Sequence, residues 1–353
     1  MLARGGVRLL WYFETSIYQK SIRYEITVVT KGVGPSTCDR RAAILGAGAM
    51  LAGAMSAGTV SIQAGEIPTG ATDCHVHVFD PTRFPYAATR DYTPGVADLA
   101  DLEKLRARLG ISRLVLVQPS VYGTDNRCLL DALRRLTPRV ARGIAVIDPT
   151  ATTDDELHTL QRLGVVGVRI NLNVKGRGYA APAVRAMSQT LARVQPFGLI
   201  AQIYVDLALL EALSDTIEAA TVPVLLDHFA GAQAQLGLDQ PGFATLPRLL
   251  ATGKVWIKLS APYRASHQGP DYPDVAPIAR ELIRHKPDRM VWASDWPHTG
   301  NGAQRAAARS STDIEPFRVV EDAHVLGLLA AWAGNDATYR AILVDNPHRL
   351  YGF

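Results

Sequence analysis

Short β-rich runs alternate with amphipathic segments from residue 71 onward, and this alternation constrains the fold more than any other feature. Eight runs are rich in β-branched and aliphatic residues, and they cover residues 71–79, 113–118, 142–147, 165–172, 199–205, 222–228, 254–260 and 290–294. Between them, apolar residues recur at spacings of three and four, as on one face of a helix, over residues 96–109, 129–136, 154–163, 183–194, 207–219, 243–250 and 275–285. Such strict alternation predicts a parallel sheet. Eight units within residues 65–353 predict an α/β fold, a single-domain (β/α)8 TIM barrel.

The alternative fold with a parallel sheet is a doubly wound open sheet. Such a sheet usually binds phosphate in a glycine-rich turn after its first strand. The residues that follow the run 71–79 contain neither a GxGxxG motif nor a P-loop, so the barrel is favoured. No internal repeat, low-complexity tract or interdomain linker follows residue 65. We therefore expect one catalytic domain over residues 65–353.

The formal net charge of +4 is concentrated near the N-terminus. Residues 1–64 hold seven basic and three acidic residues, which leaves 30 of each kind in residues 65–353. A nucleic-acid-binding domain carries a basic face, so this balance argues against nucleic acid as a partner. The three cysteines form no CxxC motif, which excludes a disulfide framework and a zinc site of that type.

The first 64 residues have the pattern of a leader and not of the barrel. Arg40 and Arg41 precede an uncharged, Gly/Ala-rich apolar run over residues 42–60. This pattern predicts a twin-arginine-type export signal over about residues 36–64. Because alanine and glycine insert into membranes less readily than leucine, a cleaved signal is favoured over a membrane anchor. We expect a periplasmic or secreted mature protein that lacks residues 1–64, with a cytoplasmic location as the alternative.

Polar residues end almost every predicted strand. In a (β/α)8 barrel the active site lies at the carboxyl ends of the strands, and the polar residues at those ends are His75, His77, Gln118, Ser120, Asp148, Arg169, Asn171, Tyr204, Asp227, His228, Lys258, Ser260, Arg264, Asp295 and His298. His75 and His77 share one face of their strand because side chains alternate with a period of two. Two imidazoles placed in this way can share a metal ion or bind one substrate oxygen. Cys74, which lies between them, is expected to face the opposite way and to pack.

Several of these strand ends lie in motifs that resemble a known family. The chain is similar to the amidohydrolase superfamily, and within it to the branch of amidohydrolase-related proteins that contains 2-pyrone-4,6-dicarboxylate hydrolase, 4-sulfomuconolactone hydrolase and galactarolactone isomerase. The likeness covers roughly residues 70–353. The motifs that carry it are TDCHVH (72–77), VQPSVYGTDN (117–126), GVRIN (167–171), LDH (226–228) and ASDWPH (293–298).

The resemblance implies roles for particular residues. Asp295 matches the general acid/base at the end of strand eight. His75, His77 and His228 match the imidazoles that hold either a metal ion or the scissile carbonyl. The residues that would bind substrate are Ser120, Arg169, Tyr204 and Arg264, with Tyr92 as a further contact from the first loop. We add His298 to these substrate-binding candidates.

The resemblance leaves the metal open. Many metal-dependent members of the superfamily use a carbamylated lysine on strand four and a histidine on strand five. This chain has Arg169 and Asn171 on strand four and Tyr204 on strand five, so a binuclear centre is disfavoured. One Zn²⁺ or Mn²⁺ ion held by His75, His77, His228 and Asp295 is compatible with the residues. Members of the branch are also known to work without a metal. Lys175 and Arg177 stand where the pyrone hydrolase has a second arginine, which puts the second carboxylate contact in doubt.

Arg169 and Arg264 follow opposite strands of the predicted barrel. Two guanidinium groups that face one cleft would select a small anionic substrate. We expect a carboxylic ester hydrolase that opens the ring of such a lactone, with Asp295 taking a proton from water. The alternatives are a lactone isomerase for sugar-acid lactones, a mononuclear-metal decarboxylase and a non-catalytic periplasmic binding protein. The only partner expected is a small anionic lactone, with no nucleic acid and no membrane beyond the export signal. The oligomeric state is not indicated by the sequence.

Overall fold

The computed structural model describes residues 66–172, 180–300 and 310–353. The predicted leader with its export signal, and the pair Lys175 and Arg177, lie outside these residues. Thr59–Phe353 forms one compact unit. Within the described part of this unit, no helix is long and apolar enough to cross a membrane.

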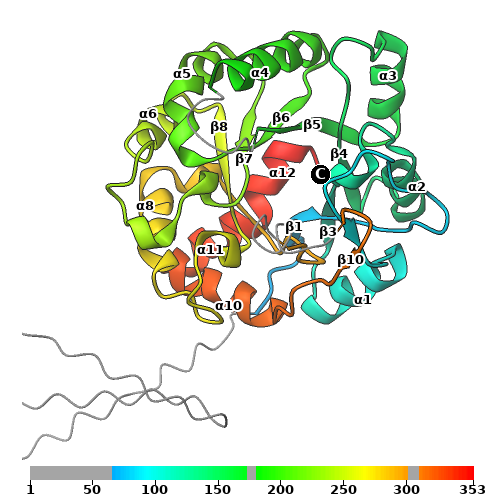
Figure 1. Cartoon of the computed structure of the whole chain (residues 1–353). Coiled ribbons are helices and arrows are strands. Elements are labelled where there is room, and N and C mark those ends of the chain that lie inside the picture. The colour runs from blue at the N-terminus through cyan, green and yellow to red at the C-terminus, as the bar shows by residue number, and fades with distance from the viewer. Residues whose placement is uncertain (1–65, 173–179, 301–309) are drawn as a thin grey trace, which may run out of the picture. The chain divides into compact units, whose positions relative to one another are not determined.

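Eight parallel strands form a ring that is surrounded by helices (Figure 1), which confirms the predicted (β/α)8 barrel. The strands follow one another around the ring in chain order, whereas the order of a doubly wound sheet reverses at a switch point. Seven of the predicted β-rich runs contain one of them completely, and the run 142–147 begins one residue after the start of its strand. The strands are β1 (Thr72–Val76), β3 (Arg113–Val117), β4 (Ala141–Ala145), β5 (Val165–Asn171), β6 (Ile200–Tyr204), β7 (Val224–Leu226), β8 (Val255–Ser260) and β9 (Met290–Ala293). A separate two-stranded sheet pairs β2 (Thr93–Pro94) with β10 (Ile314–Glu315).

The ring closes between β1 and the segment that follows β9. The backbone N–H of Asp295 donates to the carbonyl of His75 at 3.0 Å, and the N–H of His77 donates to the carbonyl of Trp296 at 2.9 Å. These are the bonds that a parallel neighbour would make. The two strands that carry His75, His77 and Asp295 are therefore held side by side by the backbone itself.

Helices cover the outside of the ring. The amphipathic segments predicted from the sequence overlap α1 to α6 and α8, although α2, α4 and α6 extend one to three residues beyond them. A hydrophobic cluster fills the space between these helices and the strands. Capping fits the local sequence: Asp98 accepts the N–H groups of Ala100 and Asp101 at the start of α1, and Gly110 ends it with φ 67°. The helices are α1 (Leu99–Leu109), α2 (Arg127–Leu136), α3 (Asp154–Arg162), α4 (Ala180–Val194), α5 (Leu210–Ala219), α6 (Thr245–Ala251), α7 (Pro262–Ala265), α8 (Val275–His285), α10 (Asp322–Ala333), α11 (Asp336–Arg340) and α12 (Asn346–Tyr351).

The helices after β9 were not predicted. α10 is apolar on nearly all sides, since most of its residues are buried, and a helix without a polar face shows no periodic stripe. α12 lies across the middle of the ring in Figure 1. Its Leu350 and Tyr351 pack with Leu225, Trp256 and Val291 in the second hydrophobic cluster, which fills the barrel interior.

β1 contains a bulge that changes the orientation of one predicted residue. The register with β3 shifts between Asp73 and Val76, so two residues of β1 oppose one of β3. Cys74 consequently packs with Trp256 in the interior cluster, on the same side of the strand as His75. The expectation that Cys74 faces away from the histidines is wrong, because strict alternation fails at a bulge. Its packing role holds, since the side chain is fully buried.

Candidate active site

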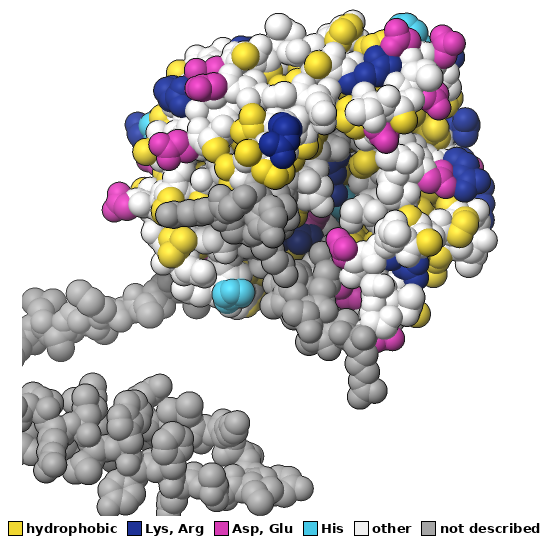
Figure 2. Space-filling view, turned by 45° about the horizontal axis from the view of Figure 1, so that its top comes forward, with side chains coloured by type: hydrophobic (Ala, Val, Ile, Leu, Met, Phe, Trp, Pro, Cys, Tyr) yellow, Lys and Arg dark blue, Asp and Glu magenta, His cyan; other side chains and the backbone are white. Residues whose placement is uncertain are grey.

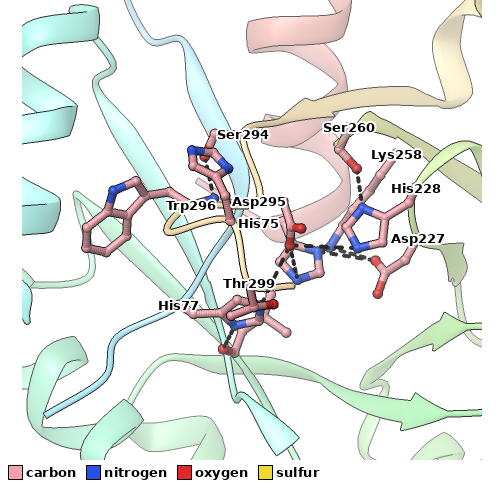
Figure 3. A network of polar contacts seen from close by, with 12 residues as sticks. His75, His77, Asp227, His228, Lys258, Ser260, Ser294, Asp295, Trp296 and Thr299 are labelled. Atoms are coloured by element: carbon pink, nitrogen blue, oxygen red, sulfur yellow. Dashed lines mark hydrogen bonds and ion pairs between the residues drawn. The ribbon is translucent and has the colours of Figure 1, made fainter. Parts of the chain in front are cut away.

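One carboxylate and three imidazoles meet at the carboxyl ends of the barrel strands (Figure 3). Asp295 Oδ1 lies 3.6 Å from His75 Nε2, 3.7 Å from His77 Nε2 and 3.8 Å from His228 Nε2. His77 is the most exposed of the four residues, at 5%. The structure thus brings together all four residues that the sequence placed at the centre of the chemistry, although they come from β1, the end of β7 and the end of β9.

The backbone turns sharply at two of these positions. His228 has φ 48° and Asp295 has φ 65°, both in the left-handed region. Residues other than glycine rarely adopt this conformation, which costs on the order of 1–3 kcal/mol. The turn immediately follows each strand and directs the side chain over the barrel mouth, where the other imidazoles lie.

Burial sets the protonation of the imidazoles. It lowers the pKa of His77 and of His228 to about 4, although the carboxylate of Asp295 acts in the opposite direction. For His75, burial and the neighbouring ammonium of Lys258 lower the pKa well below its usual value. All three rings are therefore neutral at neutral pH. Each ring then carries one N–H donor and one bare nitrogen.

Asp295 remains ionised. Burial alone would raise its pKa, but the guanidinium of Arg264 and the three imidazoles outweigh that effect and hold the pKa well below its usual range. Its Oδ2 accepts hydrogen bonds from Arg264 Nε at 2.8 Å and from the Tyr263 hydroxyl at 2.8 Å. Oδ1 is buried without a hydrogen-bond partner. The carboxylate is thus anchored through one oxygen and presents the other to the imidazoles.

Arg264 and Tyr263 lie on α7, the short helix directly after β8. Arg264 was predicted to bind substrate, and in the structure its guanidinium also lies 2.7 Å from Asp295 Oδ2 through Nη2. Arg264 therefore binds and orients the catalytic carboxylate. A contact between Arg264 and the substrate stays a prediction. Sequence reasoning missed Tyr263, since a tyrosine between proline and arginine gives no signal of its own.

His298 lies behind this pair. Its Nδ1 is 3.3 Å from the Tyr263 hydroxyl and its Nε2 is 3.0 Å from Asp322 Oδ1, a buried carboxylate at the start of α10. Both ring nitrogens face protein groups. The structure therefore favours a position that supports Tyr263 over the predicted substrate contact. Asp322 itself was not identified from the sequence.

A buried ion pair lies beneath His75. Lys258 Nζ is 3.1 Å from Asp227 Oδ1 and 3.1 Å from His75 Nδ1, and all three residues have no exposed surface. Gln202 Nε2 donates to Asp227 Oδ2 at 3.1 Å. The sequence placed Asp227 and Lys258 at strand ends but assigned them no role. The available signal was a lysine inside the otherwise apolar β8, VWIKLS.

Arg169 and Tyr204 lie at the mouth of the site. The guanidinium of Arg169 is 5.6 Å from the centroid of the Tyr204 ring, and that ring is 5.4 Å from the ring of His228. The Arg169 side chain is 11% exposed, with Nε 3.7 Å from Asp227 Oδ2. The face shown in Figure 2 is hollowed near its centre, and basic side chains lie inside the hollow. These two predicted substrate-binding residues therefore border the same site as the imidazoles.

The remaining two candidates lie near β3 and β2. Ser120 is exposed on the helical turn Ser120–Tyr122 that follows β3. Tyr92 is buried in the hydrophobic core, just before β2. Their substrate-binding roles stay predictions.

The donor set fits one divalent metal ion. Asp295 Oδ1 is a buried acceptor without a partner. The Nδ1 of His77 lies 2.7 Å from the carbonyl of Val117, and because a carbonyl only accepts, Nδ1 carries the proton and Nε2 is bare. A backbone carbonyl behind the ring is a common support for a metal-binding histidine. Two groups have ligand atoms within 4.8 Å of one another: His75, His77 and Asp295, and His75, Asp227 and His228.

Comparisons with known proteins show which family the chain resembles. The protein-family model described as amidohydrolase matches residues 72–353. A 4-sulfomuconolactone hydrolase of Rhizobium radiobacter is 38% identical over 288 residues, which cover 81% of this chain and 91% of the relative. A 2-pyrone-4,6-dicarboxylate hydrolase of Comamonas testosteroni is 34% identical over 296 residues, with 81% and 91% covered. A crystal structure of a probable 2-pyrone-4,6-dicarboxylic acid hydrolase from Acinetobacter baumannii, with citric acid bound, superposes with a TM-score of 0.65 at 26% identity and covers 80% of this chain and 100% of that one.

Proposed function

The chain belongs to the amidohydrolase family, and from this premise we propose that it hydrolyses the ring ester of a small anionic lactone. The observation that carries the proposal is the ionised Asp295, whose Oδ1 faces three neutral imidazoles. The reaction class is supported by the relatives named as hydrolases of a sulfomuconolactone and of a pyrone dicarboxylate. Arg169 at the mouth suits a carboxylate or sulfonate on the substrate, because its guanidinium binds such groups in a fork.

Two neighbouring acceptors define a place for the attacking water. Asp295 Oδ1 and the bare His77 Nε2 are 3.7 Å apart, and a water molecule can donate one hydrogen to each. As the water oxygen adds to the lactone carbonyl, Asp295 takes a proton as the general base. Without a donor between them, these two acceptors would repel each other, so the pair favours water over an empty site.

The carbonyl oxygen becomes negative during the attack and needs donors. The Ser260 hydroxyl lies 2.8 Å from His228 Nδ1; where it donates there, His228 carries its proton on Nε2. An N–H at that nitrogen stabilises the developing oxyanion. When the tetrahedral adduct collapses, the ring C–O bond breaks. The leaving oxygen takes the proton from Asp295, and the product carries one new carboxyl group and one new hydroxyl group.

A divalent ion held by His75, His77 and Asp295 would supply Lewis-acid polarisation of the carbonyl. The protein residues perform the same positioning with or without it. Arg264 and Tyr263 fix the carboxylate through Oδ2, and Arg169 orients the anionic end of the substrate.

The test is a substrate panel in ¹⁸O-labelled water. Dicarboxylated pyrones, carboxylated and sulfonated muconolactones and aldarolactones are incubated with the purified enzyme, with and without a chelator. We expect ring opening of an anionic lactone with one labelled oxygen in the new carboxyl group. Conversion of a lactone without label would show isomerisation and overturn the proposal, as would release of CO₂ or a failure to convert any lactone. Loss of activity with the chelator would assign the metal a role.

A matched pair of variants tests the general base. Asp295→Asn keeps the shape of the side chain and the acceptor for Arg264, and we expect turnover to fall by about 10²–10⁴-fold while substrate still binds. Asp148→Asn is the control, since Asp148 also follows a barrel strand but is exposed and bonded within its own turn to Thr150. Equal activity of the two variants would reject the role of Asp295.

We also propose that the protein is exported in folded form. Support comes from the sequence alone, in which Arg40 and Arg41 precede the apolar run at 42–60. Fractionation of cells that express the full chain should place the enzyme in the periplasm or the medium, with a new N-terminus near residue 65. The double variant Arg40→Lys/Arg41→Lys should remain in the cytoplasm. An intact Met1 on the exported protein, or export of the double variant at the parent level, would contradict the proposal.

A further inference from the structure

The buried Lys258 places an ammonium group next to the imidazole of His75 (Figure 3). Its Nζ lies 3.1 Å from His75 Nδ1. A lysine without any exposed surface is rare unless it is paired, and Lys258 is paired with the carboxylate of Asp227 at 3.1 Å. Burial lowers the pKa of Lys258, and the carboxylate of Asp227 acts in the opposite direction by favouring the charged ammonium.

The contact decides which nitrogen of His75 carries the proton. An ammonium group has three donors and no acceptor, so His75 Nδ1 must accept and the ring proton must lie on Nε2. The tautomer of His77 is the opposite one, since its Nδ1–H donates a hydrogen bond to the Val117 carbonyl at 2.7 Å. Two imidazoles that are two residues apart therefore present opposite chemistry to Asp295: His75 offers an N–H, and His77 offers a bare nitrogen.

A competing partner makes this assignment specific to Lys258. Asp227 Oδ1 lies 3.4 Å from the same His75 Nδ1. Without the lysine, this carboxylate would accept a hydrogen bond from an Nδ1–H. The ring proton would then lie on Nδ1, and Nε2 would be bare. A histidine supported by a carboxylate in this way is the usual arrangement of a metal ligand. The ammonium and the carboxylate thus compete for one ring nitrogen, and the ammonium is the closer of the two, at 3.1 Å against 3.4 Å.

We propose that Lys258 is a positioning residue that fixes His75 as an N–H donor. In this state His75 contributes a hydrogen bond to the oxyanion. Its Nε2 is withheld from any metal ion, which disfavours metal binding at the group that His75 forms with His77 and Asp295. The tautomer requires no assumption about the substrate. The catalytic consequence rests on the proposed lactone hydrolysis.

The first experiment observes the tautomer directly. Long-range ¹H–¹⁵N correlation spectra of the full chain with ¹⁵N-labelled histidine, recorded without substrate, distinguish a proton on Nδ1 from one on Nε2. We expect His75 to carry it on Nε2 in the parent protein and on Nδ1 in Lys258→Met. His77 should carry it on Nδ1 in both proteins and is the internal control. A parent His75 with its proton on Nδ1 overturns the inference, whether or not the variant folds.

Lys258→Met keeps the length of the side chain, and Asp227 retains Gln202 at 3.1 Å and Arg169 at 3.7 Å as partners. If the variant is unstable, the double variant Lys258→Met/Asp227→Asn removes the unpaired charge. In the spectra of this double variant, the His75 proton should no longer be confined to Nε2. The control is Lys254→Met, since Lys254 lies just before the same strand and bonds to the Ala220 carbonyl. This control should change neither the tautomer nor the metal affinity.

Two further measurements separate positioning from general support of the fold. The affinity for Zn²⁺ alone, measured by competition with a chromophoric chelator, should rise about tenfold or more in Lys258→Met, because a further bare imidazole becomes available. With a lactone that the substrate panel shows to be hydrolysed, kcat of Lys258→Met should fall while KM stays unchanged. An unchanged Zn²⁺ affinity, or equal losses in kcat and in binding, would overturn the positioning role. The histidine spectra report the tautomer even if no lactone is hydrolysed. A failure of the proposed function can therefore be distinguished from a failure of the tautomer assignment.

Discussion

Replacement of Asp73 by asparagine should stabilise the barrel, and more so as the pH rises. Asp73 lies at the seam between β1 and β9, where its Oδ1 accepts the N–H groups of His75 at 3.2 Å and of Ser294 at 3.0 Å. Its Oδ2 is buried without a partner. Burial raises the pKa of Asp73 from 3.8 to about 7, although the bonds to Ser294 and His75 act in the opposite direction. Asparagine keeps the acceptor and carries no charge.

The magnitude follows from the two pKa values. Between pH 3.8 and about 7 the native protein holds a proton on Asp73 that the unfolded chain has lost. Stability from this group is therefore complete below pH 3.8 and is lost as the pH rises through about 7. A difference of roughly three pKa units corresponds to about 4 kcal/mol. Asp73→Asn should thus gain about 4 kcal/mol over the parent at alkaline pH and almost nothing near pH 4.

Urea unfolding of the parent and of Asp73→Asn at pH 4.5, 6 and 8 measures this difference. Effects of the histidines occur in both proteins and cancel. Asp239→Asn is the control, since Asp239 is exposed and its replacement should give no pH-dependent gain. A difference between Asp73→Asn and the parent that stays constant with pH would refute the reasoning.

Further predictions concern the site itself. Because burial holds the pKa of His77 and His228 near 4, against 6.5 for a free imidazole, the native protein binds fewer protons than the unfolded chain below pH 6.5. Stability should fall between pH 6.5 and 4 by up to roughly 3 kcal/mol per ring, as read from melting curves in Asp73→Asn, and flat curves would contradict this. Tyr263→Phe removes one of the bonds that anchor the catalytic carboxylate, so kcat should fall about tenfold with substrate binding retained; an unchanged kcat would show that the hydroxyl is dispensable. Arg169→Met should raise KM for an anionic lactone but not for its methyl ester, and a similar change for both would reject anion recognition by Arg169.

The sequence allowed the barrel to be predicted from local periodicity, and the centre of the site from polar strand ends together with the family resemblance. Alternation of strands and helices predicts the ring, and polar residues at strand ends mark its functional face. The period of two correctly placed His75 and His77 together. The same rule failed for Cys74, since the extra residue of a bulge leaves no sign in a run of buried residues.

The contacts that anchor Asp295 could not be predicted, although Arg264 and His298 were expected at the site, because these contacts depend on turns and on distant packing. α7 begins after Ala261, whose φ of 49° redirects the chain, and only that turn brings Tyr263 and Arg264 onto Asp295. Likewise, Asp322 reaches His298 only because α10 returns to the barrel. Neither event is encoded in spacing along the chain.

The seam that closes the ring of strands has a consequence for how activity arises. The last inter-strand bonds are made by the peptide groups of His75, His77 and Asp295 themselves. An intermediate in which β1 or β9 has not yet joined the ring would keep most of its helices and hydrophobic burial, and yet the base would lie far from its imidazoles. Closure of the ring and assembly of the reactive centre therefore depend on the same backbone bonds. A chain in which this seam is open should be inactive.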